Sequence, residues 1–160
     1  MKKWLLLLIS HGFFLALGFM LGIYYLPLMI APAAPDSPTV LALGENAPYT
    51  GEFRRDLPGS DRFHWGQGTV FVSQEHIALH GLLAPGPDYK LYLSPQYVDN
   101  KADFLKHKAS MQRVGDVNTF ENFIVNIDGE QASHNINRYN TVVVWCEAFE
   151  QFISAAQYRE

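Results

Sequence analysis

The most reactive side chain in this sequence belongs to Cys146, the only cysteine among 160 residues. A lone cysteine excludes an internal disulfide and a zinc site built from several thiolates. A thiolate can still exchange electrons or bind iron or copper, provided that a metal or cation stabilises it. The apolar neighbours of Cys146 and the adjacent Glu147 would both raise the thiol pKa, which disfavours a free nucleophile. Three interpretations therefore remain open: a redox or ligand residue, a buried packing residue, and an intermolecular disulfide.

His64 is the histidine that could accompany Cys146, either as a second ligand of a bound centre or as a hydrogen-bonding residue in a turn. His76 and His80 would lie on one face of a strand, with Cα atoms about 13 Å apart at 3.3 Å per residue, too far for one metal ion. The sequence has no C-x-x-C-H motif, which excludes covalently attached c-type haem. Non-covalent haem or a metal remains possible, and the identity of any cofactor is unknown.

Cys146 belongs to the most strand-like segment of the chain, a β-branched and aromatic run over residues 139–149. With the two-residue period of a strand, Val142, Val144, Cys146 and Ala148 face one way and Val143, Trp145 and Phe149 the other. A strand that is apolar on both faces lies in the middle of a sheet covered on both sides. Trp145 and Tyr92 could relay an electron from Cys146, although packing is the other interpretation.

The remaining elements after Pro48 are short apolar runs separated by turn residues, which predict an all-β sandwich or barrel. A hairpin is expected in which Val70 and Val72 match Ile77 and Leu79 on the inner face. A short surface helix is expected over 99–107, and a turn at Asp128-Gly129. The predicted strands cover residues 50–54, 69–73, 76–82, 89–93, 114–117, 123–127, 139–149 and 152–154.

Residues 1–30 predict a signal anchor, a single transmembrane helix that is not cleaved. Residues 5–23, between Trp4 and the Tyr24-Tyr25 pair, would span roughly 28 Å at 1.5 Å per residue. Pro27 follows where the helix could stop. Lys2 and Lys3 predict a cytoplasmic amino terminus and an extracytoplasmic remainder, periplasmic in a bacterium. The alternative is a cleaved signal peptide, because Ala31-Pro-Ala33 resembles a cleavage site.

The anchor and the segment after it have features of their own. Gly18 and Gly22 form a G-x-x-x-G pattern, which predicts a possible homodimer through the membrane helix. His11 is an ionisable group inside the span, either functional or merely tolerated. Residues 31–47 are rich in alanine and proline and predict a semi-rigid linker without a core element, followed by a domain over 48–160.

The charge and the motifs exclude several functions. A formal net charge of −4 argues against nucleic-acid binding, which needs a basic surface. No Ser-His-Asp set, carboxylate pair or phosphate-binding loop stands out, so the sequence gives no indication of a hydrolase or a transferase. The expected partners are the lipid bilayer and a membrane or envelope redox protein.

Several of these residues occur in the order of a known module. They are Gly51 and Phe53, His64 with Gly68-Thr-Val, Gly86-Pro-Asp88 with Leu91-Tyr-Leu-Ser94, and Tyr139 with Val142 to Cys146 and Phe149. The order resembles that of the DM-thirteen domain, which is described as an electron-transfer domain and occurs beside DOMON domains or alone in bacterial membrane-anchored proteins. The resemblance covers most of residues 50–158. The chain departs from the usual family pattern around Asn118 to Phe123 and at Ile153, where the family has glycine.

The resemblance implies a β-sandwich-like fold and a redox role centred on Cys146, with His64 at a matching position. It marks Gly86, Pro87, Asp88 and Trp145 as structural residues, with Asp88 expected to fix a turn through its side chain. The alternative function is a non-catalytic interaction module in which Cys146 is structural.

Overall fold

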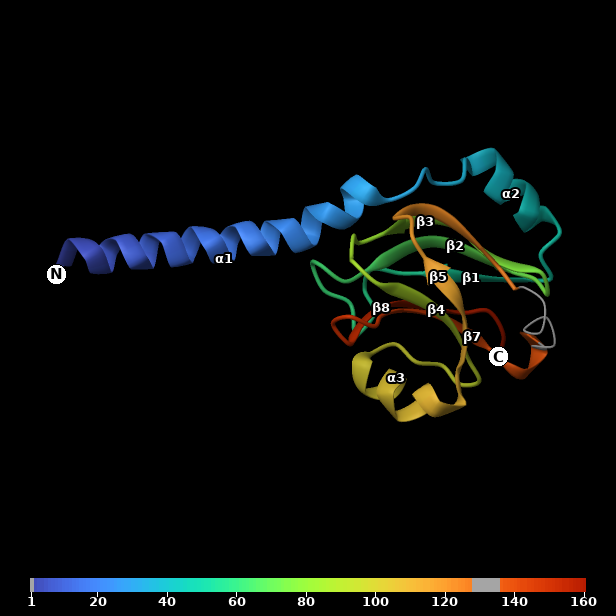
Figure 1. Cartoon of the computed structure of the whole chain (residues 1–160). Coiled ribbons are helices and arrows are strands. Elements are labelled where there is room, and N and C mark those ends of the chain that lie inside the picture. The colour runs from blue at the N-terminus through green and yellow to red at the C-terminus, as the bar shows by residue number, and fades with distance from the viewer. Residues whose placement is uncertain (1, 128–135) are drawn as a thin grey trace.

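A computed structural model of the chain describes residues 2–127 and 136–160 (Figure 1). A long amino-terminal helix extends away from a compact β domain. The elements in chain order are α1 (Lys2–Ile30), α2 (Ser37–Glu45), β1 (Tyr49–Phe53), β2 (Gly66–Val72), β3 (His76–Leu83), β4 (Tyr89–Ser94), α3 (Lys101–His107), the 3₁₀ turn η1 (Lys108–Ser110), β5 (Gln112–Val117), β6 (Glu121–Asn126), η3 (Ile136–Arg138), β7 (Thr141–Cys146) and β8 (Gln151–Gln157).

The eight strands form two four-stranded antiparallel sheets, which confirms the predicted all-β sandwich. The strand order is β1-β2-β3-β6 in one sheet and β5-β4-β7-β8 in the other. The sheets also approach each other at two edges, where β1 contacts β8 and β5 contacts β6. Helix α2 lies over the first sheet and α3 lies beyond the second, so the domain has four layers (Figure 1). The predicted turn at Asp128-Gly129 lies outside the described residues.

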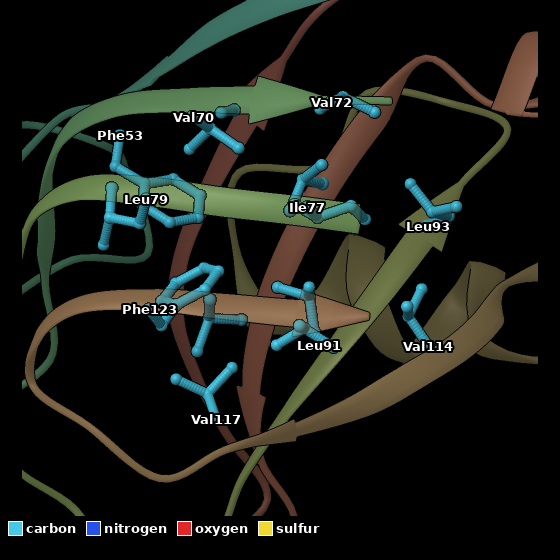
Figure 2. Close-up of a cluster of buried hydrophobic side chains, with 14 of the residues drawn as sticks. Phe53, Val70, Val72, Ile77, Leu79, Leu91, Leu93, Val114, Val117 and Phe123 are labelled. Carbon is cyan, nitrogen blue, oxygen red and sulfur yellow. The ribbon is translucent and has the colours of Figure 1, made fainter. Parts of the chain in front are cut away.

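The main core lies between the two sheets, where alternate side chains of each strand meet (Figure 2). The predicted hairpin is confirmed, because Val70 pairs with Leu79 and Val72 with Ile77 in the β2–β3 register. Opposite them, β4 contributes Leu91, which is completely buried. Burial of such aliphatic side chains, at about 1.5–3 kcal/mol each, is the main source of stability of a domain of this size.

Strand β7 is one of the two inner strands of the second sheet, and all six of its residues are buried. Val142, Val144 and Cys146 face the core between the sheets. Val143 and Trp145 face a second apolar cluster, formed with Phe104 of α3. The predicted two-faced strand is therefore confirmed up to Cys146. Beyond it the prediction was wrong, because the chain turns at 147–150 and the side chain of Phe149 is 53% exposed.

The segment 31–47 is not the unpacked spacer that its composition predicts. It contains α2, whose first turn is capped by Asp36, with the carboxylate accepting a hydrogen bond from Thr39 N at 2.8 Å. Pro38 occupies the first turn, where a missing N–H costs nothing. Val40 is completely buried against the first sheet, and Asn122 donates a 3.0 Å hydrogen bond to Pro35 O. The prediction missed this short helix because it was based on the proline content of the segment.

Helix α1 is long and apolar enough to cross a membrane. The sequence suggested that the helix could stop at Pro27, but it continues to Ile30. Pro27 is the one residue of this helix that is buried. His11 Nδ1 lies 2.7 Å from Leu7 O, within the helix, which gives this polar group a local partner. A Cβ at Gly18 or Gly22 would meet no atom of the described residues, so the predicted dimer surface is open. Dimerisation and the orientation in the membrane remain predictions.

Candidate functional site

A cavity of about 680 Å³ lies between the carboxyl-terminal half of α1 and one end of the β sandwich. We call it the anchor-end cavity. Helix α1 contributes residues between Leu17 and Tyr25 to one wall. The sandwich contributes the loop before β2, the turn before β4, and the junction of β7 with β8. The cavity brings together Cys146, His64, Gly86 and Pro87, four of the residues that the sequence singled out.

Cys146 is the last residue of β7 and is held opposite Tyr89 of β4 in the antiparallel register. Its side chain is 2% exposed. Burial raises the pKa of the thiol, while the nearby backbone of Phe149, Asp88 and Ala148 opposes that rise. The site therefore keeps a neutral thiol, yet its backbone groups favour a sulfur that carries negative charge. Such a setting suits a thiolate that is paired with a bound positive centre.

The influence of Glu147 on this thiol was predicted wrongly. The carboxylate that raises the Cys146 pKa is that of Asp88. Glu147 instead lies on the other side of the sheet, where it accepts a hydrogen bond from Tyr92 and pairs with Lys108 at 2.7 Å. Successive side chains of an extended chain point to opposite faces, so sequence neighbours need not interact.

His64 reaches the anchor-end cavity from the loop before β2, and its side chain is 33% exposed. Its Nδ1 lies 2.8 and 2.9 Å from the two carboxylate oxygens of Asp61. Although partial burial opposes ionisation, hydrogen bonds from His64 and Phe63 hold the Asp61 pKa below its ordinary value. A carboxylate only accepts hydrogen bonds, so Nδ1 carries a proton and Nε2 remains available to a ligand. A histidine oriented in this way by a carboxylate is the usual arrangement of a metal or ligand contact.

The Gly86-Pro87-Asp88 turn closes another side of the cavity. A Cβ on Gly86 would collide with the ring of Tyr89, so glycine permits the close approach. The Tyr89 hydroxyl donates a 2.9 Å hydrogen bond to Ala84 O, and burial raises the Tyr89 pKa. Asp88 O accepts a 3.0 Å hydrogen bond from Glu147 N, which ties this turn to the end of β7.

The predicted role of the Asp88 side chain was wrong. Its carboxylate pairs with Lys90 at 2.7 Å, and the backbone of Asp88 makes the contact that fixes the turn. Lys90 also pairs with Asp116 at 3.1 Å. These ion pairs lie at the edge of the second sheet.

Trp145 and Tyr92 are not part of the anchor-end cavity. Trp145 stacks on Phe104 with ring centroids 4.0 Å apart, and Tyr92 meets Phe104 edge-on at 5.3 Å. This aromatic cluster lies on the opposite face of β7 from Cys146. It explains the family resemblance at Trp145 as packing of α3 onto the second sheet.

His76 and His80 lie on β3, are not among the residues that line the cavity, and are both half-buried. Within residues 2–127 and 136–160, no three His, Cys, Asp or Glu side chains form a group that could hold a metal ion. Among the described residues, Cys146 and His64 are the cysteine and the histidine that line the cavity, and Met20 adds a thioether. A metal at this site would therefore need further ligands from a cofactor or a partner.

Several cavity residues were not predicted to belong to a functional site. Phe63 and Phe149 line the rim and are 59% and 53% exposed, although aromatic side chains of this size are usually buried. Tyr89 was expected only as the start of a strand. The residues of α1 were predicted to form a membrane anchor, but nothing in their pattern showed that they would line a cavity together with Cys146.

A sequence model of one protein family matches residues 56–158, nearly all of the β domain after β1. The family is described as "Electron transfer DM13". This description associates the domain with electron transfer in general and assigns no role to the cysteine. No significant match was found among curated proteins or among solved structures.

Proposed function

Because the chain belongs to the Electron transfer DM13 family, we propose that it is a membrane-anchored electron-transfer protein whose redox site is the anchor-end cavity. Cys146 and His64 are the side chains proposed to contact the redox group, as ligands or hydrogen-bonding partners. The observation that carries the proposal is their presence in one cavity although 82 positions separate them in the sequence.

The chemical setting of the two side chains supports this function. The backbone near the buried sulfur opposes the rise in its pKa, which favours a thiolate once a positive centre is bound. His64 is oriented by Asp61, and its second nitrogen is left for a ligand. A redox group in the cavity would be shielded from water by apolar walls. This shielding lowers the reorganisation energy of electron transfer.

The location follows from α1. The helix would hold the β domain at the membrane surface, on the extracytoplasmic side if Lys2 and Lys3 stay in the cytoplasm. The electron donor or acceptor would then be a component of the membrane or a protein of the cell envelope. The cavity opens beside the membrane helix, which is where such a partner is encountered.

A second function is favoured by one observation. Cys146 is 2% exposed and its pKa is raised, as for a cysteine that only fills a core. In that case the domain is a non-catalytic interaction module, and the cavity has no redox group.

The test is a reduced-minus-oxidised ultraviolet and visible spectrum of the full chain in lipid nanodiscs, with metal analysis of the same sample. The chain is expressed with haem available. We expect a reversible difference band that is lost or shifted in Cys146→Ala and in His64→Gln. His80→Gln, a histidine variant outside the cavity, should keep the band. A folded chain with no reversible band and no metal would contradict the redox function and favour the interaction module.

A further inference from the structure

We propose that the anchor-end cavity binds a quinone from the lipid bilayer, with the ring near His64 and Cys146 and the isoprenoid tail along α1. This inference rests on the proposed electron-transfer function and names the redox molecule that the site would use. A quinone is neutral and flat, has two oxygen atoms at the ring edge, and dissolves in the bilayer through its tail.

The composition of the cavity wall matches a neutral ligand with one polar end. Within the described chain, the residues that line the cavity include no Asp, Glu, Lys or Arg. The polar side chains that could contact a ring are those of His64, Cys146, Tyr89 and Gln151, all from the β domain. The α1 side of the cavity is aliphatic apart from the tyrosine pair. A volume of about 680 Å³ is within the usual range for small-molecule sites.

The position of the cavity along α1 favours a ligand that comes from the bilayer. Leu17, Leu21 and Ile23 line the cavity and belong to the part of α1 that would cross the hydrocarbon region. Tyr24 and Tyr25 follow at the level expected for the membrane interface. A molecule could therefore enter from the lipid side without passing through water.

The rim of the cavity is apolar, like the wall that α1 forms. Phe63 and Phe149 are both more than half exposed and come from different loops, yet both border the cavity. Exposed aromatic side chains beside a membrane helix would be covered by lipid, which removes the cost of their contact with water. The mouth of the cavity is consequently apolar on both its helix side and its domain side.

His64 gives the site its preference for a quinone over a plain acyl chain. With Nδ1 held by Asp61, Nε2 accepts a hydrogen bond from a quinol hydroxyl when the ring is neutral, and donates one to a quinone oxygen when the ring is protonated. His64 can therefore form a hydrogen bond with one oxygen of the quinone or of the quinol. An acyl chain would leave this polar group unused.

The test uses the full chain in nanodiscs and a benzoquinone with a short isoprenoid tail and a photoreactive azido group. After illumination, labelled peptides are identified by mass spectrometry. We expect labelling of the peptides around His64, Tyr89 or Cys146. Excess unlabelled quinone should abolish it, and excess phospholipid with matched acyl chains should not. Equal competition by the phospholipid would overturn the proposal and make the cavity an acyl-chain site.

Two variants locate the site without disturbing the core between the sheets. Leu21→Trp adds bulk to the α1 wall and should reduce labelling about fivefold or more, as expected for an overpacking cost of about 1–3 kcal/mol. Leu7→Trp is the matched control, half-exposed on the same helix and outside the cavity lining. It should label like the unmodified chain. Equal labelling of the Leu21→Trp and Leu7→Trp chains would overturn the proposal.

His64→Phe tests the polar contact, because it keeps an aromatic ring and removes the hydrogen bond. Labelling should fall by about tenfold, the usual effect of one lost hydrogen bond. Photolabelling needs no electron transfer, so it separates the two proposals. A reversible redox band without labelling would overturn quinone binding and leave the proposed function standing. Labelling by a quinone that the protein neither reduces nor oxidises would support the binding site and contradict the electron-transfer function.

Discussion

Cys146 and Glu147 are neighbours in the chain, but their side chains serve different faces of the second sheet. Cys146 borders the anchor-end cavity, while Glu147 lies beside the aromatic cluster under α3. The Glu147 carboxylate accepts a hydrogen bond from Tyr92 and is paired with Lys108 at 2.7 Å. This residue therefore links α3 and η1 to the sheet without taking part in the cavity.

Glu147 gives a prediction about acid stability. Although burial opposes ionisation, hydrogen bonds from Lys108 and Tyr92 hold the Glu147 pKa below its ordinary value of 4.5. A depressed carboxyl pKa adds stability above the unfolded-state value, and this stability is lost as the pH falls through the folded-state value. Glu147→Gln should therefore lower the free energy of unfolding at neutral pH and reduce its fall below about pH 5.

The measurement is denaturant unfolding of the two chains at several pH values. Glu75→Gln is the control, since Glu75 is exposed in the turn between β2 and β3. It should leave the profile close to that of the unmodified chain. If Glu147→Gln keeps the original fall in stability at acidic pH, the carboxylate is not linked to folding in this way.

At the level of elements, α2 shows how a proline-rich segment can still be part of the packed structure. Its nine residues follow a capping aspartate and place Val40 against the first sheet. Leu41, the next residue, is 44% exposed. The two adjacent positions therefore offer a direct comparison of buried and exposed side chains on one helix.

Val40→Ala should lower the free energy of unfolding of the β domain by about 1–3 kcal/mol, because it leaves a small cavity under α2. Leu41→Ala removes a larger side chain but should change stability by less than about 0.5 kcal/mol, as is usual at exposed positions. Denaturant unfolding followed by tryptophan fluorescence measures both. Equal losses in the two variants would mean that α2 does not dock on the sheet.

The elements also show what the sequence was able to predict. Alternation of apolar residues was sufficient for the β2–β3 hairpin register and the two faces of β7, because a strand has a strict two-residue period. The ends of elements were harder to place. Nothing local indicated that the chain would turn after Cys146 and expose Phe149, and proline content concealed α2. Glu147 was misjudged because its partners, Tyr92 and Lys108, are 55 and 39 positions away.

The sequence indicated two residues of the candidate site, but it did not indicate the cavity that these residues line. The family resemblance led to Cys146 and His64, and the fold places both at one end of the sandwich. The wall formed by α1 depends on how this helix lies against the β domain, and this is a tertiary property. A hydropathy pattern identifies a membrane helix but does not show which domain residues it covers.

At the scale of the whole molecule, the proposals give α1 two roles, as a membrane anchor and as one wall of the site. The β sandwich has its own core, to which α1 does not contribute. The same chain can therefore be compared with and without the wall of the cavity. A shorter chain would begin at Asp36, the residue that caps α2.

We expect alkylation of Cys146 by a small neutral thiol reagent to be slow in the full chain and severalfold faster in the chain that begins at Asp36. The side chain is 2% exposed in the full chain, and residues of α1 form part of the cavity that borders it. Burial also raises its pKa, so little thiolate is present at neutral pH to react. The rates are measured by mass spectrometry, with the full chain in nanodiscs and the shorter chain in buffer. In denaturant both chains should react alike, which controls for the reagent. If the two folded chains also react at the same rate, α1 does not cover Cys146, and the anchor would only tether a site that the β domain forms alone.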